Sequence, residues 1–221
     1  VSMSFELDNG ASNGTTSPFD NHSVTVSSDS LGSLTVHGHG GTNAASALDG
    51  TAAGDLWDNT LGLTTGVTGT AMVAAANGDN LVVYTLPTLA DGVAISVSAA
   101  TAGANHETST AIGLSYTGVE GLTLVYSSSD IVGTTGALSG DQTAWKASYA
   151  YGPITATVTQ SEYDVTTTTS DQDVSSMAVS YTISDEMSVT YGTETIESTN
   201  SGHVDAEYDV IKGSYTAGGM T

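Results

Sequence analysis

The clearest pattern in the chain is an alternation of apolar and polar residues with a period of two, and residues 143–163 show it best. On their first half Trp145, Ala147, Tyr149 and Tyr151 alternate with small or polar residues, and a turn at Gly152-Pro153 leads into a second alternating run. Successive side chains of a β-strand point to opposite faces, so each run predicts a strand with one apolar face. A connection this short joins antiparallel strands, and the stretch therefore predicts a β-hairpin.

The same unit recurs along the whole chain and predicts an all-β protein with a single domain over residues 1–221. About twelve strands are expected, near residues 1–7, 22–28, 33–39, 80–86, 93–99, 110–116, 122–128, 143–151, 154–163, 175–183, 187–196 and 206–216. Short turns near residues 30, 89, 119, 152, 185 and 218 alternate with longer polar connections. Tight turns at one end and long connections at the other predict an antiparallel up-and-down sheet.

The apolar face of such a sheet either forms a closed core or faces lipid. The expected strands run to about 8–11 residues, near the roughly 9–11 that cross a bilayer at a tilt. Short turns alternating with long connections are typical of outer-membrane barrels. Tyrosines suited to a membrane–water interface lie just before the short turns: Tyr84, Tyr116, Tyr149, Tyr151, Tyr181 and Tyr215. These features favour a transmembrane β-barrel with a polar lumen over a soluble β-protein.

Charge and cysteine content narrow the function. The net charge is -22, with 24 acidic residues against two basic ones, Lys146 and Lys212. A nucleic-acid partner requires a basic surface, so the composition excludes one. The absence of cysteine excludes disulfides and thiolate metal sites. So acidic a chain is compatible with attraction of cations, with a secreted surface array, or with a marine or halophilic setting.

Three further stretches are informative: SLGSLTVHGHG, SALDGTAAGDLWDNTLG and NLVVYTLPTLADGVAISVSAA. They resemble parts of the general porins of Gram-negative outer membranes. The first is similar to the strand before the infolded constriction loop, the second to that loop, and the third to the hairpin that follows it. The resemblance implies that residues 40–79 form the constriction loop. In that family the loop follows the fifth strand of a 16-stranded barrel, whereas here it follows the third expected strand. The chain is therefore expected to be an internal fragment, incomplete at both ends.

The resemblance also implies the function. It predicts an outer-membrane protein that forms a water-filled channel for passive diffusion of small hydrophilic solutes and ions. It further implies contact with outer-membrane lipid and assembly as a homotrimer. The alternative from the residues alone is a secreted surface-layer or adhesin-type β-protein, with calcium as a possible ligand. No catalytic motif occurs in the sequence, which predicts that the protein is not an enzyme.

The candidate pore-constriction residues are His37, His39, Asp49, Asp55, Asp58 and Lys146. The two histidines share the polar face of one strand, at a position where the related porins carry arginines, and no third ligand that would complete a metal site is identifiable. The three aspartates lie on the expected constriction loop, where carboxylates create a potential that attracts cations. Lys146 lies on the polar face of its strand and could pair with a carboxylate. The sequence therefore predicts a cation-preferring pore whose preference weakens at acid pH.

Overall fold

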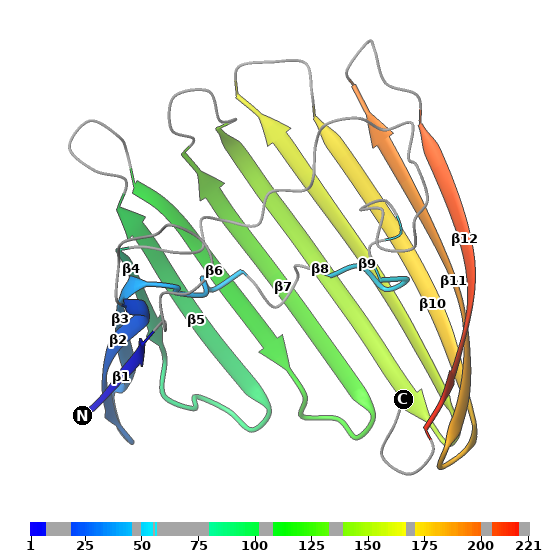
Figure 1. The fold of residues 1–221 in the computed structure, drawn as a ribbon, viewed down its shortest axis with the longest axis horizontal. Coiled ribbons are helices and arrows are strands. Elements are labelled where there is room, and N and C mark those ends of the chain that lie inside the picture. The colour runs from blue at the N-terminus through cyan, green and yellow to red at the C-terminus, as the bar shows by residue number, and fades with distance from the viewer. Residues whose placement is uncertain are drawn as a thin grey trace.

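The computed structural model describes residues 1–7, 19–45, 50–54, 56, 80–101, 108–132, 139–166, 171–199 and 205–216. They form twelve strands: β1 (Ser2–Leu7), β2 (Phe19–Ser28), β3 (Gly32–His39), β4 (Leu81–Thr85), β5 (Val93–Thr101), β6 (Thr108–Tyr116), β7 (Leu122–Ile131), β8 (Gly140–Tyr151), β9 (Ile154–Val165), β10 (Gln172–Ser184), β11 (Met187–Ser198) and β12 (Ala206–Tyr215). All belong to one sheet in chain order, and each pair of neighbours is antiparallel (Figure 1). The predicted up-and-down architecture is confirmed. These residues contain no helix long and apolar enough to cross a membrane.

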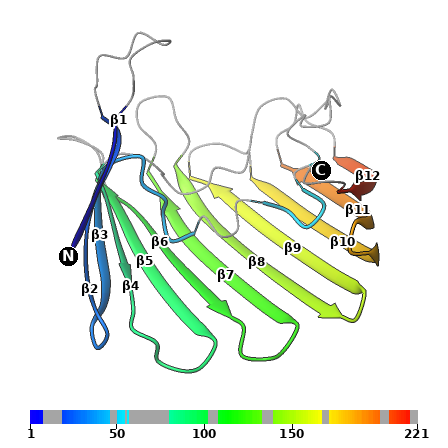
Figure 2. The same ribbon diagram turned by 60° about the horizontal axis from the view of Figure 1, so that its bottom comes forward.

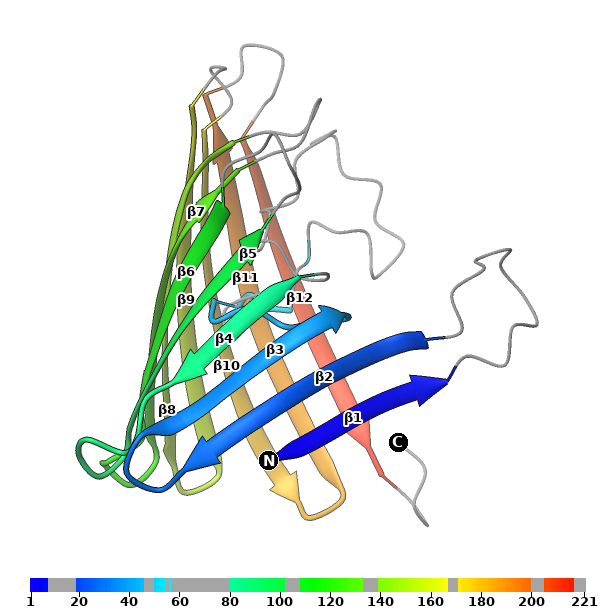
Figure 3. The same ribbon diagram turned by 90° about the vertical axis from the view of Figure 1, so that its left-hand side faces the viewer.

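The sheet curves from β1 round to β12 and forms part of a barrel wall. From the side, β1–β4 lie in front of β10–β12, with an interior between them (Figure 3). β1 and β12 are the two edge strands of the sheet and are not paired with each other. The total of sixteen strands stays a prediction.

The outer face is apolar and uncovered. On β10 the side chains of Met177, Val179, Tyr181 and Ile183 are 45%, 39%, 48% and 54% exposed, respectively. The alternate residues Ser176 and Ala178 are 5% and 6% exposed, because they face the interior. This is the predicted alternation. A β-sandwich would bury the apolar set under a second sheet, so the exposed set excludes that architecture.

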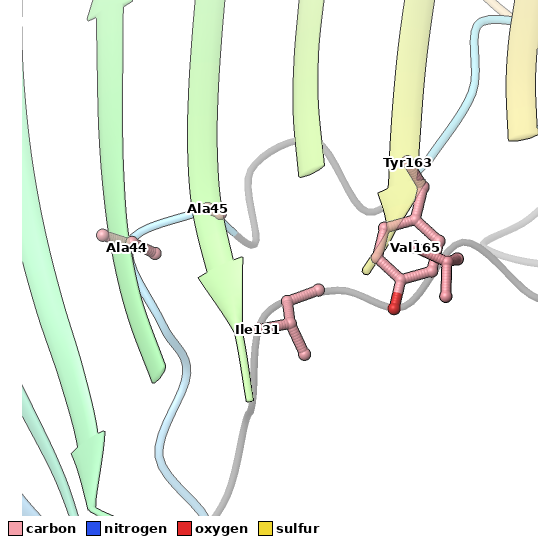
Figure 4. Close-up of a cluster of buried hydrophobic side chains, with 6 residues drawn as sticks. Ala44, Ala45, Ile131, Tyr163 and Val165 are labelled. Carbon is pink, nitrogen blue, oxygen red and sulfur yellow. The ribbon is translucent and has the colours of Figure 1, made fainter. Parts of the chain in front are cut away.

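The inner face changes character along its length. Toward the short turns it carries cross-strand hydroxyl pairs, such as Ser148 with Thr157 at 2.9 Å and Ser188 with Ser214 at 2.7 Å. Toward the long connections it carries an apolar cluster instead, made of Ala44, Ala45, Ala111, Ile131, Tyr163 and Val165 (Figure 4). The inner face is therefore polar, as predicted, apart from this apolar cluster, which lies among polar side chains such as Ser109, Ser129 and Gln172.

Candidate channel lumen

Residues 41–45, 50–54 and 56, here called the inner segment, lie between β3 and β4 in sequence and against the concave face of the sheet (Figure 2). β3 and β4 are direct neighbours, with Leu34 opposite Tyr84. The chain therefore leaves the wall after β3, crosses the inner face and returns to the adjacent strand. The order of strands in the sheet is not interrupted, because β4 still pairs with β3.

The first part of the inner segment packs against β3–β6. The backbone N–H of Ala44 donates a hydrogen bond to Ser98 Oγ of β5 at 3.0 Å. Gly41 fits closely between two inward side chains, since a Cβ there would come within 2.7 Å of the His37 ring and 2.8 Å of Leu81. On β6, a side chain at Gly113 would collide with the carbonyl oxygen of Ala44. Small residues on both sides thus allow the backbone to lie directly on the wall.

The second part is a tight turn, Gly50–Gly54, here called the inner turn. The N–H of Gly54 donates to the carbonyl of Thr51 at 3.2 Å, and Gly54 has a φ of +88°, which favours glycine. Ala53 at the turn and Leu56 just beyond it are 4% and 1% exposed. The inner turn is therefore packed against the wall.

Four strands supply the groups that hold the inner turn. The N–H of Ala52 donates to Thr159 Oγ1 of β9 at 3.0 Å, and the N–H of Ala53 donates to Ser176 Oγ of β10 at 2.9 Å. The Thr51 hydroxyl donates to Glu194 of β11, and the Lys212 ammonium of β12 donates to the carbonyl of Ala53. Gly192 of β11 lies beneath the turn, where a Cβ would come within 2.9 Å of the Ala53 Cβ.

The carboxylates of the strands near the long connections point outward. Cross-strand pairing places Asp130, Asp141 and Asp164 in one outer row and Glu162, Asp173 and Glu197 in another. Glu207 and Asp209 of β12 are likewise exposed, and the Tyr191 hydroxyl donates to Asp209 at 2.8 Å. Among the inward strand side chains that the structure describes, the charged groups are Glu194, Lys146 and Lys212. The strand wall therefore adds little negative charge to the lumen.

The predicted pore-constriction residues differ in where they lie and in how exposed they are. His37 faces inward and is half-buried beside Gly41, and His39 is exposed at the end of β3. Lys146 is half-buried on the inner face, and within the described ranges no ion pair joins it to a carboxylate. Asp49, Asp55 and Asp58 lie outside the described residues. No group of three His, Asp or Glu side chains in the described part of the chain is arranged to hold a metal ion.

The six predicted interface tyrosines all lie on outward positions of their strands, near the short turns: Tyr84, Tyr116, Tyr149, Tyr151, Tyr181 and Tyr215. Tyr151 is the most exposed of these tyrosines, at 74%. The Tyr84 hydroxyl donates a hydrogen bond to the carbonyl of Leu31 in the turn between β2 and β3.

Sequence analysis did not single out Glu194 or Lys212. One signal was available for Lys212, which is one of two basic residues in the chain and alternates with outward Ile211. Glu194 carried no signal, because its partner Thr51 is 143 positions away in sequence.

Comparison with known proteins identifies the family. The model of the Gram-negative porin family matches residues 1–221. The chain belongs to the Gram-negative porin family. This porin also resembles solved structures. It shares 16% identity with a porin refined at 1.8 Å resolution, with a TM-score of 0.60 over 90% of this chain and 71% of the other.

A second similar structure is a loop L8 deletion mutant of OmpT, an outer membrane protein of Vibrio cholerae. Its identity is 17%, its TM-score is 0.56, and the match covers 87% of this chain and 67% of that one. No curated protein matches the sequence. At these identities the solved structures establish the fold, and the family match establishes an outer-membrane porin channel, as predicted.

Proposed function

We propose that this porin is a cation-preferring channel for passive diffusion, narrowed by residues 40–79. Solutes pass through it unchanged, so the chain supplies a sieve and an electric field and no covalent step. The observation that carries the proposal is the path of the inner segment, which crosses the concave face between β3 and β4 and is hydrogen-bonded to strands on both sides. A segment lying across the inner wall reduces the cross-section of the lumen.

The cation preference rests on Asp49, Asp55 and Asp58, which belong to the same stretch of sequence. The outer carboxylate rows cannot replace them, because exposed charges are screened over about 8 Å at physiological ionic strength. The inward lysines Lys146 and Lys212 oppose the preference. Carboxylates at a narrow point with low-dielectric walls outweigh more distant charges.

His37 and His39 make the preference depend on pH. Histidine is the side chain that most often carries pH sensitivity in proteins, and both histidines belong to β3. His37 contacts the start of the inner segment at Gly41, so its charge acts where the lumen is narrowed. We expect the cation preference to fall between pH 8 and pH 5.

The test is the reversal potential across a planar bilayer under a KCl gradient, at pH 8 and pH 5. A cationic potential at pH 8 that shrinks at pH 5 is expected, and a variant with His37 and His39 replaced by Gln should lose the shrinkage. Anion preference at pH 8 would refute the electrostatic proposal and leave the barrel intact. Equal cation preference at both pH values would show that the aspartates set the selectivity and that the histidines do not lie at the constriction.

The proposal extends to assembly and ligands. A homotrimer in outer-membrane lipid is expected from the family, with small hydrophilic solutes and ions as cargo. Calcium stays a prediction. The stretch DGTAAGDLWD loosely resembles a calcium-binding loop, without matching the EF-hand pattern, and lies partly outside the described residues.

A further inference from the structure

The inner turn is held by one acidic and one basic side chain from adjacent strands, and the described strands carry few ionisable side chains on this face. Glu194 of β11 is fully buried, with 0% exposure, and accepts the Thr51 hydroxyl. Lys212 of β12 is half-buried and donates to the carbonyl of Ala53. The two charged groups thus engage different residues of one turn.

The geometry around Lys212 is close. A Cβ added to Gly54 would come within 2.8 Å of the Lys212 Nζ, so the turn passes directly over the ammonium group. An ammonium held against a carbonyl forms a charge-assisted hydrogen bond, which is stronger than a neutral one. Lys212 therefore contributes more to holding the turn than a neutral donor could.

Neutral groups complete the attachment. Ser176 accepts from the N–H of Ala53 at 2.9 Å and donates to the carbonyl of Thr193 at 3.0 Å, which ties the turn to β10 and β11 together. Thr159 adds a bond from β9 at 3.0 Å. A buried carboxylate is costly unless hydrogen bonds satisfy it. The Thr51 hydroxyl supplies one such bond to Glu194, so seating of the turn favours the buried side chain.

We propose that Lys212 and Glu194 are positioning residues that hold the inner turn against β9–β12 and so set the bore of the channel. The inference deepens the proposed function and rests on it, because the inner turn belongs to the stretch proposed to narrow the lumen. Lys146 lies on the same inner face without contacting the turn in the described part of the chain. It provides a control in which the same charge is removed.

The chain contains no cysteine, so a single one at Ala53 reports on the turn. Ala53 is 4% exposed, and Ala53→Cys should react slowly with a small charged thiol reagent in planar bilayers or vesicles. Adding Lys212→Met should raise the rate about tenfold or more, as expected when a charge-assisted bond to a seated group is lost. Adding Lys212→Arg, which retains a charged donor, should keep the slow rate. Adding Lys146→Met should also keep it, although it shifts ion selectivity.

Variants of Glu194 give a second test that does not depend on the folding of the Lys212 variant. Glu194→Gln keeps an acceptor for Thr51 and should label only slightly faster than Ala53→Cys alone, whereas Glu194→Leu should label much faster. Each variant is first checked for insertion and for channel formation. Equal labelling rates in the Lys212→Met and Lys146→Met backgrounds would overturn the proposal.

Conductance distinguishes the positioning of the inner turn from the narrowing of the lumen. Lys212→Met should alter single-channel conductance and the size limit for sugars in liposome swelling, and Lys212→Arg should restore both. If Lys212→Met speeds labelling but neither it nor the attached label alters conductance, the positioning role stands and the proposed narrowing fails. If the label lowers conductance while Lys212→Met leaves the labelling rate unchanged, the narrowing stands and the positioning role fails.

Discussion

Gly192 is the residue of β11 on which the inner turn rests, and Gly192→Ala tests that contact directly. The new Cβ would lie 2.9 Å from the Ala53 Cβ and 3.2 Å from its Cα. Carbon atoms in contact prefer about 3.5–4.0 Å, so Ala53 has to move away from the wall by about 0.6–1.1 Å. We expect Gly192→Ala to push the inner turn into the lumen.

The size of the effect follows from the bonds that the movement stretches. The hydrogen bond from the Ala53 N–H to Ser176 Oγ, now 2.9 Å, would lengthen to about 3.5–4.0 Å, beyond the range in which such a bond is effective. Overpacking of this kind costs about 1–3 kcal/mol. Replacing a strand glycine by alanine returns about 0.5–1 kcal/mol through the backbone alone.

Gly213→Ala is the matched control. Gly213 lies on β12, and a Cβ there meets no atom within 4 Å. Both variants share the backbone gain, so that gain cancels in their difference. The assays are urea unfolding in lipid vesicles and single-channel conductance. Gly192→Ala should be less stable than Gly213→Ala by about 1–3 kcal/mol and should conduct less. Equal stability and equal conductance of the two variants would refute the close contact.

Two further predictions concern the outer face and assembly. Val179→Lys places a charge on the lipid side of β10 and should lower the free energy of unfolding in vesicles by about 2–4 kcal/mol, whereas Ser180→Lys on the inner side should be tolerated; equal losses would contradict the assignment of faces. Native mass spectrometry in detergent should give the mass of three chains, and a single-chain mass under mild conditions would rule out the proposed homotrimer.

Alternation predicted all twelve strands, and it predicted best the strand ends at the short turns. There the outer face meets lipid and the inner face meets water, so apolar and polar residues separate cleanly. At the long connections the pattern reverses. On β7 the outward Asp130 is exposed and the inward Ile131 is 5% exposed, and on β10 the inward Val174 is 2% exposed beside outward Asp173. The strands consequently extend beyond their predicted ends, to Ile131 on β7 and back to Gln172 on β10.

Sequence patterns could not predict which strand residues hold the inner turn. Its bonds join residues 107 to 159 positions apart, from Ala52–Thr159 to Ala53–Lys212. Hydroxyl residues are frequent on every inner strand face, so Thr159 and Ser176 look like any other. Only the path of the chain across the wall determines which of them contacts the turn.

The outward carboxylates have a consequence for the membrane itself. On β10 the outer face is uncharged from Ser175 to Ile183, and Asp173, the next outward residue, is about 33 Å along the strand from Ile183. At the tilt of roughly 40° usual for such barrels, this distance spans about 25 Å of bilayer, the height of the usual apolar band. Asp173 and its neighbour Glu162 therefore lie at the level of the hydrated headgroups and mark one edge of the hydrocarbon layer. A thicker membrane would bring both carboxyl groups into hydrocarbon, and such hydrophobic mismatch costs fractions of a kcal/mol per ångström.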